Sequence, residues 1–254
     1  MGLTYKISAT IPYDMCDVNG NVRVPQMMAL AMQVSGMQSI EVGMADDVIL
    51  ERFGLVWIIS DHTLEITRLP RFLENVVIET EAVSHNRYFC YRNFRIMDVE
   101  GNILMAQRTT FMLMDIETRK VQTVINEIVE AFQSEFVKKI IRMSKFKDLE
   151  HPTEKEFRVR FYDLDMNGHV NNGKYLEWVY ESLSEDFLMN HVPTKIELKY
   201  VKEVMPGGLI QTVVELEEVD SIISHHEVHS DGDVNAYARM EWRSYKESEG
   251  EHEL

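Results

Sequence analysis

The stretch DLDMNGHVNN, residues 163–172, contains the feature that decides the fold, because part of it occurs twice in the chain. Residues 165–170 read DMNGHV and residues 17–22 read DVNGNV, so both hexapeptides fit the pattern D-x-N-G-x-V. Asp165 follows Asp17 by 148 residues. Asn-Gly is a strong turn signal, and the repeat therefore predicts two copies of one structural unit, each containing the same turn.

A segment with helical spacing of apolar residues follows each turn. In the first half Pro25 fits the first position of a helix. In the second half Asn171 or Asn172 is a candidate N-cap. The apolar side chains that follow are spaced as one buried helix face, and they are Tyr175, Leu176, Trp178, Val179 and Leu183.

Runs rich in β-branched and aromatic residues follow each helix, and Gly, Pro, Asn and Asp mark their ends, as is typical of strands. These runs are Leu55–Ile66, Val76–Ser84, Tyr88–Met97 and Ile103–Asp115, then Thr194–Tyr200, Leu209–Glu218, Ile222–His229 and Asn235–Trp242. The pattern predicts an α+β protein in which each antiparallel sheet wraps around one long helix. We expect domains at residues 1–120 and 154–246, joined by a connector at residues 121–153 with a helix near Ile125–Phe136.

Composition narrows the class of protein. The chain has 254 residues, of which 45% are hydrophobic and 27% charged, as in an ordinary globular protein of one or two domains. The net charge of −16 argues against general nucleic-acid binding, since phosphates must be met by excess Lys and Arg. Two cysteines predict neither a disulfide framework nor a zinc site, and we expect no cofactor. Without an apolar leader or a membrane-spanning run, we expect a cytoplasmic location.

The second turn has two interpretations. It is either a polar strand-to-helix turn with an incidental histidine, or a catalytic site. His169 precedes a helix N-terminus, where free N–H groups and the helix dipole favour developing negative charge. Asp165 and Asn167 can orient neighbouring groups and water. The first copy has Asn21 where His169 stands, and this difference favours a duplicated site that is active in one half.

DLDMNGHVNNGKYLEW resembles the motif of the hotdog thioesterases, and the tandem arrangement most resembles the bacterial-type acyl-ACP thioesterases (acyl-[acyl carrier protein] hydrolases). The first half supports this resemblance through LVWIISDHTLEITRLPRFLENVVIET and TTFMLMDIETRKVQ. The resemblance covers nearly the whole chain. It implies two tandem hotdog domains, of which the first shapes the acyl pocket. It also implies hydrolysis of fatty acyl-acyl carrier protein, which releases free fatty acid and terminates chain elongation.

The resemblance also implies a set of catalytic residues, which fall on Asp165, Asn167, His169 and Glu203. Many plant members have a cysteine after that glutamate, and Val204 stands there in this chain. Water is therefore the expected attacking group. Alignment of the first half places either Arg71 or Thr67 opposite Glu203, so no acid matches it there.

We further expect Glu203 and His169 to hold and deprotonate the water, and backbone amides after His169 to stabilise the oxyanion. Strand alternation would place Glu203 on the face that carries Glu197 and Lys199. Glu203 would then point at the site only if Ile196, Leu198 and Tyr200 are the outward residues or if a bulge intervenes.

The implied partner is an acyl carrier protein, which is itself acidic, so binding requires a local basic face on this acidic chain. The candidates lie in the connector and are Lys138, Lys139, Arg142, Lys145 and Lys147, although a solvated face is an equally good interpretation. The alternatives to this function are an acyl-CoA thioesterase and a non-catalytic acyl-binding hotdog protein. Either a monomer or a homodimer fits two hotdog domains in one chain.

Overall fold

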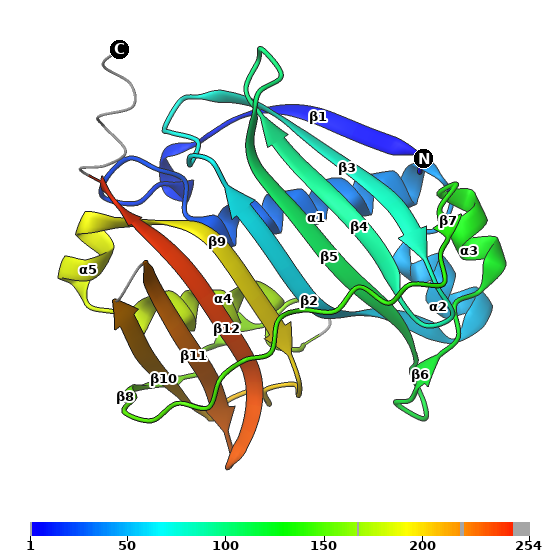
Figure 1. Cartoon of the computed structure of the whole chain (residues 1–254). Coiled ribbons are helices and arrows are strands. Elements are labelled where there is room, and N and C mark those ends of the chain that lie inside the picture. Colours follow the sequence, from blue (N-terminus) through cyan, green and yellow to red (C-terminus); the bar gives the residue numbers. More distant parts are fainter. Residues whose placement is uncertain (1, 167, 219–220, 246–254) are drawn as a thin grey trace. The chain divides into compact units, whose positions relative to one another are not determined.

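The computed structural model describes residues 2–166, 168–218 and 221–245. These residues form two compact units, Met1–Arg142 and Met143–Leu254, which we call unit 1 and unit 2 and describe separately (Figure 1). The division between them falls inside the predicted connector, and the first part of that connector belongs to unit 1. No helix among the described residues is both long enough and apolar enough to span a membrane.

Unit 1 is an antiparallel sheet with a long helix packed against it. Its elements are β1 (Thr4–Thr10), α1 (Val24–Glu41), α2 (Asp46–Phe53), β2 (Leu55–Ile66), β3 (Asn75–His85), β4 (Cys90–Met97), β5 (Ile103–Asp115), β6 (Val121–Gln122), α3 (Asn126–Ala131) and β7 (Glu135–Phe136). The strand order is β1-β3-β4-β5-β2, with β6 paired to β5 and β7 paired to β3. Helix α1 packs against β1 and β3.

Unit 2 repeats this arrangement. Its elements are β8 (Thr153–Arg158), α4 (Asn172–Glu181), α5 (Glu185–Asn190), β9 (His191–Tyr200), β10 (Leu209–Glu218), β11 (Ile222–Ser230) and β12 (Asp233–Ser244). The strand order β8-β10-β11-β12-β9 matches that of unit 1 strand for strand, and α4 packs against β10 and β11. Short 3-10 helices, Tyr13–Met15 and Phe161–Asp163, stand at corresponding positions before the two turns.

The predicted α+β class is confirmed, and three of the eight predicted strands have the predicted bounds, namely β2, β5 and β10. The helices differ more from expectation. Helix α1 has 18 residues, whereas α4 has only 10 before the chain turns and begins α5. Pro25 occupies the second helical position and not the first, because α1 begins at Val24. The predicted helix near Ile125–Phe136 is the shorter α3.

The helix faces that the sequence marked as apolar are the buried ones. In α1 the side chains of Met27, Met28, Ala31 and Val34 are buried, at the spacing of one helix face. The five apolar residues predicted for the second helical segment are also buried, although Leu183 lies after α4. Burying a large apolar side chain stabilises the fold by roughly 1.5–3 kcal/mol, so these faces fix both helices on their sheets.

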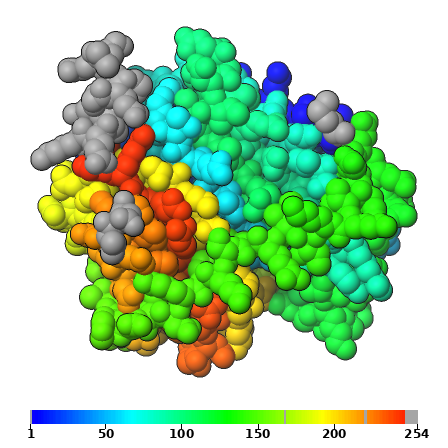
Figure 2. All heavy atoms as spheres, in the orientation of Figure 1, coloured from blue at the N-terminus to red at the C-terminus, as the bar shows by residue number. Residues whose placement is uncertain are grey.

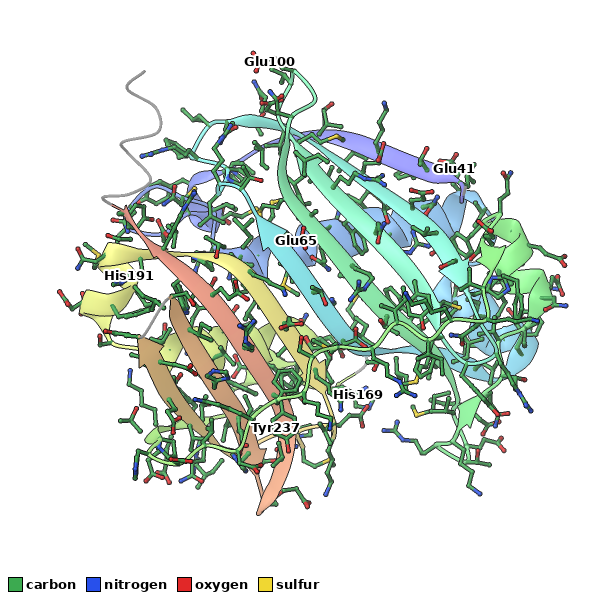
Figure 3. The ribbon with its side chains drawn as sticks, in the orientation of Figure 1. Glu41, Glu65, Glu100, His169, His191 and Tyr237 are labelled. Atoms are coloured by element: carbon green, nitrogen blue, oxygen red, sulfur yellow. The ribbon has the colours of Figure 1, made fainter. Side chains whose placement is uncertain are left out.

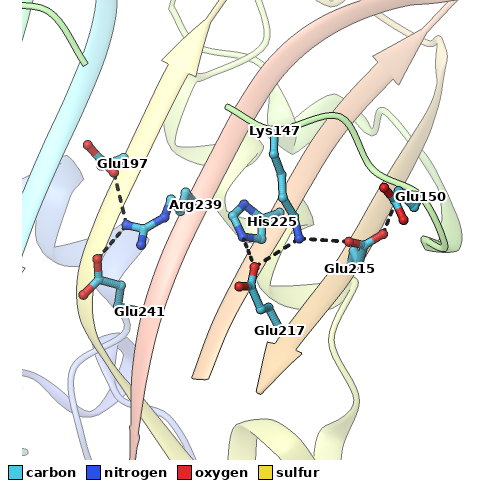
Figure 4. A network of polar contacts seen from close by, with 8 residues as sticks. All are labelled: Lys147, Glu150, Glu197, Glu215, Glu217, His225, Arg239 and Glu241. Carbon is cyan, nitrogen blue, oxygen red and sulfur yellow. Dashed lines mark hydrogen bonds and ion pairs between the residues drawn. The ribbon is translucent and has the colours of Figure 1, made fainter. Parts of the chain in front are cut away.

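The segment that leads into β8 is held on the outer face of the unit 2 sheet. The Lys147 ammonium lies 3.0 Å from a Glu215 carboxylate oxygen and 3.1 Å from one of Glu217 (Figure 4). The ring of Phe146 stacks on Tyr237, with ring centroids 5.4 Å apart. Apolar and ionic contacts together therefore make this part of the connector an ordered segment.

Candidate active site

The second D-x-N-G-x-V segment is a tight turn closed by the side chain of its own aspartate. The Asp165 N–H donates to the His169 carbonyl (2.8 Å), and the Gly168 N–H donates to the Asp165 carbonyl (3.0 Å). The His169 N–H donates to the Asp165 carboxylate (3.2 Å). Gly168 has φ +77°, a conformation that glycine adopts without steric cost. Asp165 therefore fixes the turn that presents His169.

The first copy forms the same turn. The Asp17 N–H donates to the Asn21 carbonyl (2.8 Å), and the Gly20 N–H donates to the Asp17 carbonyl (3.1 Å). The Asn21 N–H donates to the Asp17 carboxylate (2.9 Å), and Gly20 has φ +78°. These three hydrogen bonds thus form with either asparagine or histidine at the fifth position of the turn, so they do not require His169.

His169 lies exposed just before α4. Asn171 is the N-cap, as one of the two sequence alternatives had it, and its side-chain oxygen accepts the Gly173 N–H (2.8 Å). The Asn171 N–H donates to the Asp163 carbonyl (2.9 Å). In the described part of the chain the Asn172 N–H has no hydrogen-bond partner. A free amide at a helix N-terminus can donate to an oxyanion.

Of the four predicted site residues, Asn167 lies outside the described residues. Asp165 is partly buried, and His169 and Glu203 are exposed. Figure 3 labels His169 near the end of β9. At this end of β9 the hydroxyl of Tyr200 donates to the carbonyl of Asn172, the first residue of α4 (2.9 Å). The start of α4 is therefore in direct contact with the end of β9. His169 precedes α4, and Glu203 follows β9.

Glu203 does not lie on a strand, and this corrects the sequence expectation. Strand β9 ends at Tyr200, so Glu203 belongs to the loop of residues 201–208. The side-chain alternation of a strand ends with the strand, and the Glu197–Lys199 face does not set the direction of Glu203. Burial, together with the Glu203 charge, raises the pKa of Tyr175 to about 12, although the hydrogen bond from the Val204 N–H acts to lower it.

Two tyrosines connect this loop to α4. The Tyr175 hydroxyl accepts the N–H of Val204, the residue after Glu203, at 2.9 Å. The ring of Tyr175 packs edge-on against that of Tyr200, with centroids 5.2 Å apart. Burial raises the pKa of Tyr200 well above its ordinary value. Tyr175 follows the second turn in the N-N-x-x-Y pattern, but nothing in the sequence showed that its partner is an amide 29 residues later.

The corresponding loop of unit 1 identifies the counterpart of Glu203. The N–H groups of Thr67 and Arg68 both donate to the Leu104 carbonyl, and those of Val201 and Lys202 both donate to the Asn235 carbonyl. Val201 follows Thr67 by 134 residues, and this offset places Leu69 opposite Glu203. Neither Arg71 nor Thr67, the two predicted counterparts, stands there. Unit 1 thus has asparagine and leucine where unit 2 has His169 and Glu203.

Other nucleophiles and metal ligands give no competing site among the described residues. Both cysteines are free thiols. Burial raises the pKa of the Cys90 thiol to about 12 and also raises that of Cys16, which disfavours the reactive thiolate. No described group of three or more His, Cys, Asp or Glu side chains could hold a metal ion. The predicted site residues His169 and Glu203 therefore stay the candidates for chemistry at the second turn.

Two units with one strand order, each with its helix against an antiparallel sheet, define a tandem hotdog protein. The acyl-ACP thioesterase N-terminal domain matches residues 2–132, and the acyl-ACP thioesterase C-terminal domain matches residues 146–244. These two matches cover most of the chain. The chain belongs to the acyl-ACP thioesterase family.

Curated relatives agree with this membership. The chloroplastic oleoyl-acyl carrier protein thioesterase of Coriandrum sativum is 26% identical over 230 residues, which are 84% of this chain and 62% of that protein. The chloroplastic dodecanoyl-[acyl-carrier-protein] hydrolase of Umbellularia californica is 24% identical over 202 residues, which are 74% of this chain and 53% of that protein. The chain thus spans between half and two thirds of the length of these relatives.

Solved structures share the fold over nearly the whole chain. A Lactobacillus plantarum protein described as an oleoyl thioesterase is 28% identical, with a TM-score of 0.91 over 96% of this chain and 97% of that one. An acyl-ACP thioesterase from Bacteroides thetaiotaomicron is 19% identical, with a TM-score of 0.84 over 94% of this chain and 98% of that one. The second likeness shows the fold alone.

Proposed function

We propose that this protein hydrolyses the thioester of fatty acyl-acyl carrier protein and releases the free fatty acid, which terminates chain elongation. One observation carries the proposal. The two turns share three closing hydrogen bonds, yet only the second has a histidine, and the loop after β9 has Glu203 where the loop after β2 has Leu69. Since these hydrogen bonds do not require the histidine, chemistry is the better explanation for the difference.

In the proposed mechanism His169 and Glu203 hold a water molecule and take its proton as the water oxygen bonds to the thioester carbonyl carbon. The carbonyl oxygen becomes an oxyanion, and the Asn172 N–H at the start of α4 donates to it. Collapse of this intermediate breaks the carbon–sulfur bond, and the proton returns to the departing thiolate. Base assistance of this kind is typically worth about 10²–10⁴ in rate, and one oxyanion donor about 10²–10³.

The remaining site residues have supporting roles. Asp165 fixes the turn through the His169 N–H, and we assign to Asn167 the orientation of the water or of His169. Val204, which stands where many plant members have cysteine, is buried and has no nucleophilic group. The attacking group in this proposal is therefore water, and no acyl-enzyme intermediate forms.

We propose that the carrier protein docks on the basic part of the connector. The side chains of Lys138, Lys139, Arg142 and Lys145 are exposed and form no ion pair within the described residues. Figure 2 shows side chains of the segment between β7 and β8 (green) at the surface. Lys147, the fifth candidate, is engaged by Glu215 and Glu217 and contributes less charge to a partner. A homodimer and a cytoplasmic location stay predictions.

The test is release of free thiol from oleoyl- and dodecanoyl-acyl carrier protein and from the matching CoA thioesters. We expect rapid release from the carrier-protein thioesters, reduced at least about 100-fold by His169→Ala and by Glu203→Ala. His229→Ala is the matched control, because His229 lies on β11 and pairs with Glu227 (2.8 Å). Faster release from the CoA thioesters would mean that the protein is an acyl-CoA thioesterase with the same reaction. No release from any thioester would leave an acyl-binding protein.

A further inference from the structure

The loop after β9 and the loop after β2 follow the same path, so they can be compared residue by residue. Glu74 N–H donates to the Arg71 carbonyl, and Gly208 N–H donates to the Met205 carbonyl, at the same 134-residue offset. The residues before these donors, Leu73 and Gly207, both have positive φ, +64° and +77°. Pro70 and Phe72 of unit 1 therefore correspond to Val204 and Pro206 of unit 2.

In unit 1 this loop is bonded to the backbone of the turn. The Val22 N–H donates to the Pro70 carbonyl (2.8 Å), and the Phe72 N–H donates to the Gly20 carbonyl (3.0 Å). These two bonds form a bridge between Asn21 and Arg71. The Val22 N–H and the Gly20 carbonyl are therefore occupied, and no substrate group can use them.

In unit 2 the bridge is absent. Pro206 stands in place of Phe72 and has no N–H to donate to Gly168. Within the described residues, neither the Val170 N–H nor the Gly168 carbonyl has a hydrogen-bond partner. The Val170 N–H and the Gly168 carbonyl are thus unpaired, whereas their counterparts in the first turn, the Val22 N–H and the Gly20 carbonyl, are paired.

Two polar side chains hold the unit 2 loop in place of the missing bridge. The Tyr175 hydroxyl accepts the Val204 N–H (2.9 Å). The side-chain amide of Asn235 donates to the carbonyls of Lys202 (3.3 Å) and Glu203 (3.2 Å). Both side chains are buried. The counterparts in unit 1 are Met27 and Leu104, since Tyr175 follows Met27 by 148 residues and the Leu104 carbonyl accepts as the Asn235 carbonyl does.

We propose that Tyr175 and Asn235 are positioning residues, which fix Glu203 for catalysis and hold its loop off the turn so that the turn backbone stays open to substrate. This proposal rests on the proposed function. Glu203 is exposed and its loop lies outside a strand, and the two anchors fix the backbone that presents its carboxylate. Misplacing a catalytic group by about 1 Å costs on the order of 10²-fold in rate.

The first test is Tyr175→Phe, which removes the hydroxyl and keeps the ring that packs on Tyr200 and Trp178. We expect kcat for oleoyl- or dodecanoyl-acyl carrier protein to fall more than about tenfold, with KM little changed and the protein still folded at the assay temperature. In a Glu203→Gln background the same substitution should change kcat less than about twofold, because the group it positions is already gone. Asn235→Leu, which installs the unit 1 residue, should behave in the same way.

Tyr180→Phe is the matched control, since Tyr180 lies on the same helix and contacts Trp242, away from the loop (ring centroids 5.8 Å apart). It should leave kcat within about twofold of the unmodified protein. If Tyr175→Phe keeps full activity, or if its effect adds in full to that of Glu203→Gln, then Tyr175 does not position Glu203 and the proposal is wrong.

A second measurement separates this proposal from the proposed function. Hydrogen exchange of the Val204 amide should become faster in Tyr175→Phe and stay unchanged in Tyr180→Phe, whether or not any thioester is hydrolysed. Unchanged exchange at Val204 would show that Tyr175 does not anchor the loop. If exchange at Val204 becomes faster but the unmodified protein hydrolyses no thioester, then Tyr175 anchors the loop and the proposed function is wrong.

Discussion

At the scale of single residues, the first turn is a natural control for the second. His169→Asn would give the second turn the residue that the first turn has in Asn21. Because the turn forms with either residue and His169 is exposed, we expect the free energy of unfolding to change by less than about 0.5 kcal/mol. Thioester hydrolysis should fall at least about 100-fold.

Thermal melting and thiol release on the same preparations check this prediction. A variant that melts as the unmodified protein does and still hydrolyses thioester would return His169 to the role of an incidental turn residue. A variant that unfolds would instead show that the second turn, unlike the first, needs its histidine for stability.

The sequence predicted some of these residues and could not predict others. The repeat alone singles out Asp165 and His169, because the turn is local and its hydrogen bonds lie within five residues. The counterpart of Glu203 could not be aligned in the same way, since the offset between the copies changes from 148 at the turn to 134 at the loop. The offset changes because the helices between the turn and the loop differ in length. Only the matching hydrogen bonds at the ends of β2 and β9 align the two loops and identify Leu69 as the counterpart of Glu203.

At the scale of elements, the strands were more predictable than the helices. Alternating β-branched and aromatic runs mark most strands to within a few residues. The short helices α2 and α5 have 8 and 6 residues, below the length at which isolated helices are stable. They depend on caps and on tertiary packing, as in α5, where Ser184 caps the helix by accepting the Phe187 N–H, and a sequence pattern does not report that packing.

The end of α4 is joined to the sheet through a buried histidine, which predicts a pH dependence of stability. The two ring nitrogens of His226 lie 3.1 Å from the Ser182 hydroxyl and 2.8 Å from the Ser224 hydroxyl. Burial, with a smaller effect of nearby His225, lowers the pKa of His226 from 6.5 to about 3. Between these two pH values the unfolded chain binds a proton that the folded protein does not.

The free energy of unfolding should therefore fall as the pH falls below about 6.5, by up to about 1.4 kcal/mol per pH unit for this histidine. Urea unfolding at pH 7, 6 and 5 measures the slope. His226→Gln should reduce the slope, because glutamine does not titrate. An unchanged slope in His226→Gln would mean that His226 is not buried in its neutral form.

At the scale of the whole molecule, net charge and local charge oppose each other. The chain has a net charge of −16, and an acidic carrier protein is repelled by it at long range. Exposed cations in the connector attract such a partner only at short range, within about 8 Å at physiological salt. The balance predicts that a few side chains decide whether the carrier protein binds.

The test is Lys138→Glu combined with Arg142→Glu, two exposed side chains of unit 1. The control is Lys6→Glu combined with Lys120→Glu, which are exposed elsewhere on unit 1. Both pairs change the net charge equally, from −16 to −20, so a difference between them reports position and not total charge. We expect the connector pair to raise KM for acyl-acyl carrier protein at least about tenfold with little change in kcat. Acyl-CoA has no carrier protein, so the two double variants should hydrolyse it with similar kinetics. If both double variants have the same KM for acyl-acyl carrier protein, the docking face lies elsewhere.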